Sequence, residues 1–320
     1  MTDSSPELAV ETRSLSKSYR IGHLRPRRHP ALHDLTLAVP RGEIFGYLGP
    51  NGSGKTTTLK LLMGLVFADA GSARLLGREV SDPRCRERVG YLPEHPYLYD
   101  YLTAAEYLDY VGRLFGMDKT SRRARSGELL ERVGLKAAAR TPLRRFSKGM
   151  LQRIGLAQAL MNSPDVVFLD EPMSGLDPLG RRLVREIILD LRAHGHTVFF
   201  STHILSDAET LCDRVALLRA GRLVAVGRLD EILNLDIAHM EVLISGLRDE
   251  AVAVLPGEAG NRRKIGERWA IPAAEKELGA LVRAVEEGGG RILSVQPVRQ
   301  SLEDYFLKEM AADQGAGSWD

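Results

Sequence analysis

Alternating apolar and polar residues dominate the first fifty positions. Leu35, Leu37 and Val39 recur at every second position, and the apolar run IFGYL follows. Alternation is typical of a half-buried strand and a short apolar run of a fully buried one. TRSLSKSYR and LHDLTLAVPRGEIFGYLG are therefore predicted strands. The basic, proline-broken HLRPRRHP between them is predicted as a solvated loop, with a contact to acidic lipid headgroups as the alternative.

A helical period replaces this pattern between about residues 95 and 160. LTAAEYLDYVGRLFG opens with a capping box from Thr103 to Glu106 and carries its apolar residues on one face. SGELLERVGL repeats the pattern. RRFSKGMLQRIGLAQAL predicts a further amphipathic helix with Ser147 at its N-cap. The segment is expected to form an all-helical subdomain.

Strands and helices alternate again from PDVVFLDEP onward. VVFL, TVFFST and VALLRAGRLVAVG read as strands. PLGRRLVREIILDLRAHG reads as a helix, with Asp177 as N-cap, Pro178 in the first turn and Gly195 at the end. This order predicts an α/β fold whose mostly parallel sheet carries the helical subdomain as an insertion.

The pattern of apolar and polar residues changes after Gly227. HMEVLISGL, AVAVL and RILSVQPV are predicted short strands, and SLEDYFLKEM a final helix. We therefore expect a main domain over residues 10–228 and a small α+β accessory domain over 229–310. Residues 1–9 and 311–320 are expected to be disordered.

Composition narrows the functional classes. The 320 residues are 44% hydrophobic and 27% charged with a net charge of +2, an ordinary globular balance that gives no argument for nucleic acid as a partner. Cys85 and Cys212 lie in no metal-binding spacing, and two cysteines fit a reducing cytoplasm. No apolar run approaches the ~18 residues of a membrane span, so any membrane function needs another chain to cross the bilayer.

A phosphate-binding loop is the strongest motif. GPNGSGKT, from Gly49 to Thr56, fits G-x-x-x-x-G-K-[ST] between an apolar strand and a helix. The glycines let backbone N–H groups turn toward phosphates, Lys55 reaches the β- and γ-phosphates, and the Thr56 hydroxyl can ligate Mg²⁺. The helix adds the positive end of its dipole.

Four other positions are candidates for the same chemistry. DVVFLDEP places Asp170, suited to hold Mg²⁺, and Glu171, suited to polarise a water, at the end of a buried strand. An ordinary acidic turn is the alternative. His203 ends the next strand in STHIL, where it could sense the γ-phosphate, although a lone His is more often structural. Tyr19 could stack on adenine, and core packing explains it nearly as well.

FSKGM offers a second helix start suited to an anion. Ser147 is a good N-cap and Gly149 permits close backbone approach. By itself this pattern favours a capped helix and nothing more. In a chain with a separate phosphate loop, it could instead serve the nucleotide bound by a second copy.

Taken in order, GPNGSGKTT, YLPE, FSKGM, VVFLDEP, SGLDP and STH resemble the ATP-binding cassette (ABC) ATPases over about residues 10–228. SKGM-x-QR and SLEDYFL are similar in detail to subunits of ABC-2 type exporters. The resemblance implies a P-loop NTPase fold with an antiparallel β edge. It also implies ATP and Mg²⁺ as ligands, with ATP contacted by Tyr19, Gly49, Pro50, Asn51, Gly52, Ser53, Gly54, Lys55, Thr56 and Thr57. The metal would be held by Thr56, Glu94 and Asp170, and catalysis would depend on Glu171, His203 and Lys55. The residues that match the family's signature motif are Ser147, Lys148 and Gly149, and Asp177 matches its acidic loop.

Two departures from the family pattern stand out. Glu94 replaces the usual Gln of the loop that senses Mg²⁺ and the permease. A carboxylate can still ligate the metal, but it cannot donate a hydrogen bond unless protonated. Lys148 and Met150 replace the Gly and Gln of the general signature, and Lys148 adds positive charge. Both signature changes are familiar in the exporter subgroup.

The resemblance implies an ATP-hydrolysing motor subunit at the cytoplasmic face of the membrane. Its expected partners are an integral membrane permease and a second ATP-binding subunit, with a homodimer favoured over a heterodimer. HPYLYDYLTAAEYL would supply the docking surface. A cassette ATPase without transport, for example in cofactor assembly, is the alternative; the intact Lys55, Asp170, Glu171 and His203 disfavour a non-catalytic binder. The cargo is not indicated.

Overall fold

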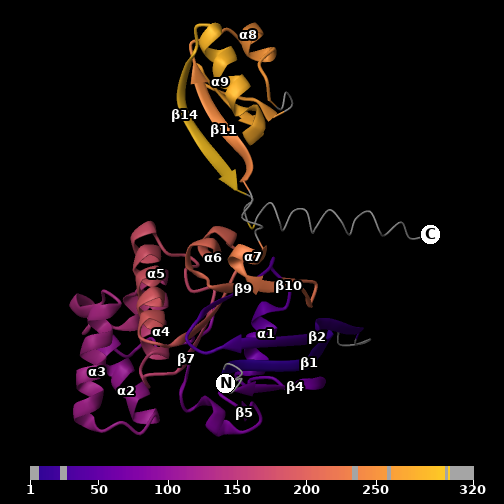
Figure 1. Cartoon of the computed structure of the whole chain (residues 1–320). Coiled ribbons are helices and arrows are strands. Elements are labelled where there is room, and N and C mark those ends of the chain that lie inside the picture. Colours follow the sequence, from indigo (N-terminus) through magenta and orange to yellow (C-terminus); the bar gives the residue numbers. More distant parts are fainter. Residues whose placement is uncertain (1–6, 22–26, 233–236, 258–260, 300–301, 303–320) are drawn as a thin grey trace, which may run out of the picture. The chain divides into compact units, whose positions relative to one another are not determined.

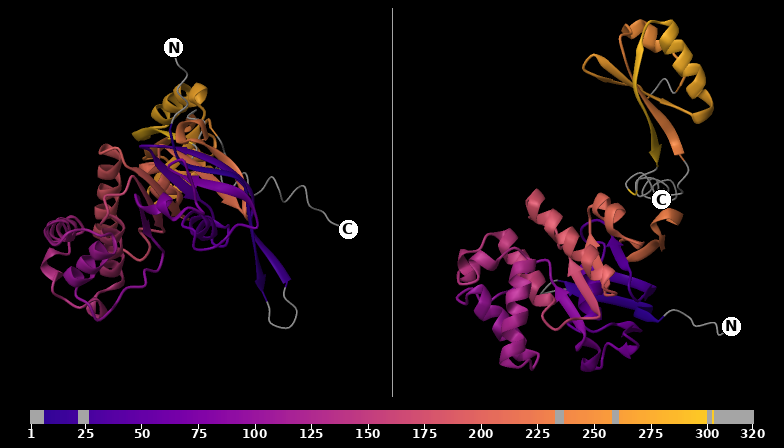
Figure 2. Two further views of the ribbon diagram at one scale, coloured as in Figure 1. Left: turned by 90° about the horizontal axis from the view of Figure 1, so that it is seen from below. Right: turned by 60° about the vertical axis from the view of Figure 1, so that its left-hand side comes forward.

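The computed structural model describes residues 7–21, 27–232, 237–257, 261–299 and 302. It contains two compact units, Met1–Leu229 and Asp230–Asp320 (Figures 1 and 2). Among the described residues, no helix combines the length and the apolar character needed to cross a membrane.

A six-stranded sheet is the centre of the first unit. Its order is β10-β9-β3-β8-β7-β6, parallel except for the antiparallel pair β9 and β10. The strands are β3 (Ile44–Leu48), β6 (Val89–Leu92), β7 (Val166–Asp170), β8 (Thr197–Thr202), β9 (Arg214–Arg219) and β10 (Arg222–Arg228). Every residue of β3, β7 and β8 is buried, which explains their continuous apolar runs. Because these strands are parallel, their carboxyl ends meet at one edge.

An antiparallel sheet of order β2-β1-β4-β5 lies in the same unit, as the expected antiparallel edge. It contains β1 (Leu8–Ile21), β2 (Arg27–Pro40), β4 (Ala70–Leu75) and β5 (Arg78–Glu79). One apolar cluster joins the two sheets, with Leu35 and Phe45 among its members, and the Phe45 and Phe199 rings lie 5.3 Å apart.

The extents predicted for the N-terminal leader and for the basic loop were wrong. β1 begins at Leu8, inside the predicted leader, because Ala9 is fully buried in the core. β2 begins at Arg27, inside the predicted loop, because the hairpin continues through the pairs Tyr19–His29 and Arg20–Arg28. Pro30 is tolerated there since β2 is an edge strand, where a missing N–H interrupts no ladder on the open side.

The helices of the first unit are α1 (Lys55–Leu62), α2 (Ala104–Leu114), α3 (Lys119–Arg132), α4 (Lys148–Ala159), α5 (Pro178–Ala193) and α6 (Leu205–Leu211), with short 3₁₀ turns at Pro83–Arg86, Lys136–Ala138 and Leu143–Arg145. The short helix α7 (Leu229–Ile232) begins at the boundary between the two units. The capping box is confirmed: Thr103 Oγ1 accepts from Glu106 N at 3.3 Å, and Thr103 N donates to Glu106 Oε2 at 2.9 Å.

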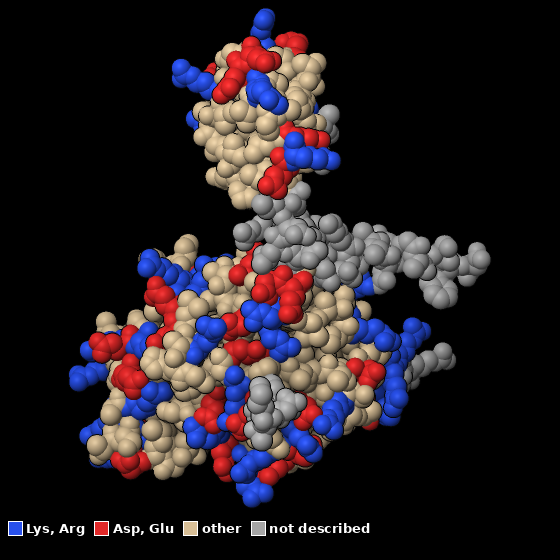
Figure 3. All heavy atoms as spheres, in the orientation of Figure 1, with Lys and Arg blue, Asp and Glu red and all other residues tan. Residues whose placement is uncertain are grey.

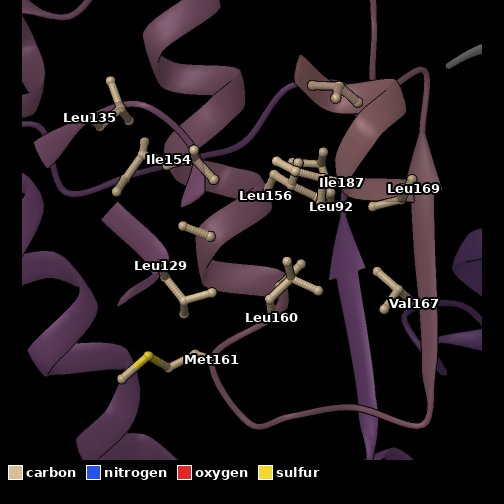
Figure 4. Packing of buried hydrophobic residues seen from close by; sticks show 14 of the residues in the cluster. Leu92, Leu129, Leu135, Ile154, Leu156, Leu160, Met161, Val167, Leu169 and Ile187 are labelled. Atoms are coloured by element: carbon tan, nitrogen blue, oxygen red, sulfur yellow. The ribbon is translucent and has the colours of Figure 1, made fainter. Parts of the chain in front are cut away.

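Helix α4 attaches the inserted helices to the sheet. Figure 4 shows Ile154 and Leu156 of α4, and Leu160 directly after it, near apolar side chains of β6 and β7 such as Leu92 and Leu169. These three residues are fully or almost fully buried. The start of α4 at Ser147 is thus fixed by packing further along the same helix.

VALLRAGRLVAVG is not one strand, as predicted, but the hairpin of β9 and β10. Ala220 and Gly221 both have positive φ, 46° and 76°, as the two-residue turns that suit a twisted hairpin require. Gly221 N donates to Ser53 O at 2.9 Å. The turn therefore braces the phosphate loop.

The second unit is a four-stranded antiparallel sheet of order β12-β13-β11-β14. It contains β11 (Ile237–Ser245), β12 (Arg263–Ile265), β13 (Arg268–Ala273) and β14 (Arg291–Arg299), the helices α8 (Asp249–Ala253) and α9 (Leu278–Glu287), and a 3₁₀ turn at Glu275–Glu277. Val242, Ile271 and Leu281 are fully buried in its core.

One strand predicted here was wrong. AVAVL overlaps the helix α8, whose Val252 faces the core together with Leu255, three residues further on. Asp249 and Glu250 in the first turn favour the helix electrostatically. The predicted helix SLEDYFLKEM lies outside the described residues except for Leu302.

Candidate functional site

The phosphate loop between β3 and α1 is held in a conformation that requires glycine. Gly54 precedes α1 with φ 107°, and a Cβ there would lie 2.5 Å from Ala31 O. A side chain would therefore be strained in its backbone and would collide with β2. The loop thus presents its backbone at the amino end of α1, where N–H groups and the helix dipole favour an anion.

Lys55 is buried beneath this loop. Its Nζ donates to Gly49 O at 2.6 Å and to Pro50 O at 3.2 Å, and lies 3.7 Å from Glu171 Oε1. Burial lowers the Lys55 pKa, whereas the nearby Glu171 and Asp170 carboxylates act against that shift. The ammonium is thus already placed between the loop and the carboxyl ends of the strands.

Asp170 ends β7 with one oxygen satisfied and one free of hydrogen bonds. Its Oδ1 accepts from Ser201 Oγ at 2.5 Å, whereas its buried Oδ2 has no hydrogen-bond partner among the described residues. Burial raises the Asp170 pKa; the hydrogen bond from Ser201 and the nearby Thr56 hydroxyl oppose this rise, and the Glu94 charge adds to it. A buried carboxylate oxygen without a donor is suited to a cation.

Glu171 adopts a backbone conformation that is rare for its residue type. Its φ is +50°, and its amide donates to Ser201 Oγ and Ser201 O, both at 3.2 Å. Gln152 Nε2 donates to Glu171 O at 3.4 Å. His203 Nδ1 lies 2.9 Å from Glu171 Oε2. Strain retained by surrounding bonds is typical of functional sites.

Sequence reasoning did not identify Ser201 and Gln152 as supports for these acids. Ser201 was identifiable in principle, because it lies directly opposite Asp170 in the parallel register of β7 and β8. Gln152 carries no local signal, because its contact with Glu171 depends on how α4 packs against the sheet.

A cleft of about 460 Å³ opens over this cluster. It brings together most of the loop with the acidic and histidine residues predicted far along the chain. Its lining is His29, Ala31, Asn51, Gly52, Gly54, Lys55, Thr56, Thr57, Glu94, Glu171, Ser174 and His203. Sequence reasoning had not singled out His29, Ala31 or Ser174. Asp170 lies beneath the cleft, while Gly49, Pro50 and Ser53 shape the loop without lining it.

The signature residues and Tyr19 are not part of that lining. Ser147 is the exposed N-cap of α4, and its Oγ accepts from Met150 N at 3.3 Å. Lys148 is also exposed, and its side chain lies over Gly175, where an added Cβ would be 2.8 Å from Lys148 Cε. Asp177 caps α5, as predicted, by accepting from Gly180 N at 2.8 Å.

The residues at the cleft fit Mg²⁺. The unpartnered Asp170 Oδ2, the Thr56 hydroxyl and the exposed Glu94 carboxylate are all oxygen donors, the type this cation prefers. They are few, which suits a metal that completes its coordination with substrate phosphates and water.

A phosphate loop, a buried strand-end acid pair and a histidine in one cleft define a nucleotide site. The ABC transporter family model matches residues 32–174. An ABC transporter ATP-binding protein of Synechocystis sp. is 47% identical over 303 residues, which is 94% of this chain and 84% of that protein. The chain belongs to the ABC transporter ATP-binding proteins.

Two further comparisons show which ABC proteins resemble this chain. The Nod factor export ATP-binding protein I of Ralstonia nicotianae is 39% identical over 245 residues, 76% of this chain and 74% of that protein. A solved dimeric ATP-binding cassette, in a post-hydrolysis state with ADP and Pi bound, is 25% identical with a TM-score of 0.64, covering 69% of this chain and 98% of that one. The protein is a Mg²⁺-dependent ATPase of the ABC family, with relatives among exporter subunits.

Proposed function

We propose that two copies of this ABC protein close head to tail around two ATP molecules and drive a separate membrane permease. One observation carries the proposal: the helix start at Ser147 is exposed and does not line the chain's own cleft. An exposed helix N-terminus with a neighbouring lysine is suited to an anion supplied from outside. The partner's ATP is that anion in our proposal.

Within each cleft, some groups of the chain bind the phosphates and others act on the attacking water. The loop backbone and the Lys55 ammonium bind the β- and γ-phosphates. Glu171 accepts a proton from the attacking water, and His203, 2.9 Å away, holds that carboxylate in place. Bound Mg²⁺, held by Thr56, Asp170 and Glu94, would supply positive charge to the phosphate oxygens.

ATP closes the dimer because the closed state alone contacts each nucleotide from both chains. A ligand shifts such an equilibrium only by its differential affinity for the two states. Charge-assisted hydrogen bonds contribute roughly 1.5–3 kcal/mol each, so the several made by Ser147, Lys148 and the α4 amides would be sufficient. Hydrolysis removes the γ-phosphate and reopens the pair.

The permease docks on the helical subdomain in this proposal. A cleft of about 1130 Å³ lies there between α2, α3 and the segment before them. Tyr99, Tyr101 and Tyr110 form an aromatic cluster along it, with the Tyr99 and Tyr110 rings 5.3 Å apart. Tyr101 is 65% exposed. Exposed aromatic clusters of this kind are enriched at protein interfaces.

Export is proposed because relatives such as the Nod factor export subunit carry that role in their names. The chain would then act at the cytoplasmic face of the membrane, where ATP is available. The cargo is left open.

Mixing inactive variants tests the two-chain site. Lys55→Ala disables a chain's own cleft, and Ser147→Arg blocks only the cleft of its partner. Each should be inactive alone. An equal mixture should recover about a quarter of wild-type ATPase activity, because half of the dimers have one intact site of two.

The matched control mixes Lys55→Ala with Glu171→Gln. Both lie in the same cleft, at 3.7 Å between Nζ and Oε1, so every site in the mixed dimer stays defective and no activity should return. Recovery in the control but not in the first mixture would refute the proposed sharing of residues.

A further inference from the structure

The outer half of the β1–β2 hairpin extends beyond its sheet as a two-stranded ribbon. β4 pairs with β1 only as far as Ser16 opposite Ala70, whereas β1 pairs with β2 as far as Ile21 opposite Arg27. Figure 2 shows this ribbon projecting away from the rest of its unit. His29 lines the nucleotide cleft from one face of the ribbon. The other face lies outside the site described above.

Two arginines lie directly across the ribbon from each other on that other face. Arg20 pairs with Arg28, and the next pair along the ribbon is Tyr19 with His29. Successive residues of a strand project to opposite faces, so Arg20 and Arg28 project away from the side of His29. Directly opposed residues have Cβ atoms about 5 Å apart, where like charges repel. Both arginines are exposed, so they meet the solvent as a concentrated positive charge.

No acid among the described residues forms an ion pair with these two arginines. The sequence has no Asp or Glu from position 20 to position 33. Asp69 is within electrostatic reach of Arg28, but its oxygens accept from Lys17 Nζ at 3.0 Å and from Ser18 N at 2.7 Å. Those two bonds lower the Asp69 pKa more than the Arg28 charge does. Asp69 is therefore already paired, and the two guanidinium groups lack a counter-ion.

Such a pair suits the phosphate groups of an acidic surface. Each guanidinium can form two parallel hydrogen bonds with a phosphate. Arg20 and Arg28 line neither of the two clefts described above, so neither cleft encloses a small soluble anion beside them. An exposed ion pair with a single soluble anion gains little in water. A membrane instead presents many phosphates at once, with a negative surface potential that attracts clustered cations.

We propose that Arg20 and Arg28 form a binding surface for acidic phospholipids, which holds this hairpin against the membrane. The sequence has four arginines within positions 20–28, comparable to the basic clusters that bind acidic lipids. Figure 3 shows Lys and Arg gathered at this edge of the first unit. A nucleic-acid partner needs a broader basic footprint, and the net charge of the whole chain is only +2. The lipid contact is separate from the contact with the permease.

Vesicle flotation of the full chain, without nucleotide or permease, tests this surface. Vesicles with equal amounts of phosphatidylglycerol and phosphatidylcholine are compared with vesicles of phosphatidylcholine alone. Wild type should bind the acidic vesicles and detach at high salt, because salt screens exposed charges. Each cation near an acidic membrane strengthens binding about fivefold, so replacing both arginines by glutamine should weaken it about 25-fold. Arg20→Lys with Arg28→Lys keeps both charges and should retain most of the binding.

Arg248→Gln with Lys276→Gln is the matched control, because it removes two exposed cations from the second unit. This control should bind the acidic vesicles as wild type does. Arg20→Gln with Arg28→Gln should hydrolyse ATP at the wild-type rate, since neither arginine lines the nucleotide cleft. A normal rate would show that the loss of lipid binding does not come from misfolding.

Three results would overturn the lipid surface: no binding of wild type to acidic vesicles, unchanged binding in the glutamine variant, or an equal loss in the control. Displacement by inorganic phosphate beyond that caused by sodium chloride of equal ionic strength would make a soluble phosphate the ligand instead. Tighter binding to duplex DNA, lost in the same variant, would assign the surface to nucleic acid. The mixed-variant ATPase assay contains no lipid, so the proposed two-chain site and this lipid surface can fail separately.

Discussion

His203 Nδ1 lies 2.9 Å from Glu171 Oε2, although 32 positions separate the two residues in the chain. They meet because β7 and β8 are parallel neighbours and each residue follows the carboxyl end of its strand. The contact joins the proposed base to the proposed sensor of the γ-phosphate. A change at one residue should therefore be felt at the other.

Glu171→Gln should bind ATP and hydrolyse it about 10²–10⁴-fold more slowly, because an amide cannot accept the proton from water. Because the bound ATP is not hydrolysed, the closed dimer should accumulate. It is measurable as a doubled mass in the presence of ATP and Mg²⁺. Glu186→Gln, an exposed residue of α5 paired with Arg182, is the control and should leave turnover unchanged. Normal turnover in Glu171→Gln would remove Glu171 from the mechanism.

Asp170→Asn should abolish Mg²⁺-dependent hydrolysis yet stabilise the protein without metal. Burial raises the Asp170 pKa, so the folded state holds the proton more readily than the unfolded state. The protonated Asp170 carboxyl therefore contributes folding stability at pH values below its ordinary pKa of 3.8. This contribution is lost as the pH rises through the raised pKa of the folded state. At neutral pH the ionised carboxylate is destabilising, and Asn removes that charge.

Thermal unfolding without metal measures this effect, and Asp69→Asn is the contrasting control. Bonds from Lys17 and Ser18 N lower the Asp69 pKa, so its ionised form favours folding and its loss should lower the Tm. A lower Tm for metal-free Asp170→Asn at pH 7 would show that its buried charge is not the dominant effect.

Gly175→Ala should cost about 1 kcal/mol of folding free energy, because its φ of +70° disfavours a side chain. The new Cβ would also displace Lys148 at the proposed interface, so ATPase activity should fall. Gly77→Ala has a similar φ of +80° with nothing within 4 Å, and should lose stability alone. Chemical denaturation and turnover separate the two effects; equal activity in both variants would argue against an interface role for Lys148.

Reversing Lys119 and Arg123 to Glu should weaken attachment to native membranes while ATP hydrolysis by the isolated chain stays unchanged. Both cations are exposed on the aromatic cleft of the helical subdomain, far in sequence from the phosphate loop. Co-sedimentation with membranes measures the effect. Lys276→Glu, an exposed change in the second unit, should leave attachment intact. Full attachment of the reversed variant would move the docking surface elsewhere.

Several elements were predictable because their causes are local. The capping box at Thr103 and Glu106, the N-caps Ser147 and Asp177, and the glycine-bearing phosphate loop all depend on residues within a few positions of one another. The buried runs of β3, β7 and β8 were predictable for the same reason. In the second unit, α8 was missed because the five residues AVAVL, with valines at 252 and 254, alternate as a strand would and are too few to show a helical period.

The amino-acid sequence by itself determined the ABC family, the phosphate loop and the order of the chemical groups along the chain, since each depends on residue type and short spacing. Only the tertiary structure decided which distant groups touch. Ser201 supports Asp170, and Gln152 contacts Glu171, through strand register and helix packing. His29 lines the cleft although β2 precedes the phosphate loop in the chain. Such contacts join residues far apart in sequence, and no local pattern records the geometry that brings them together.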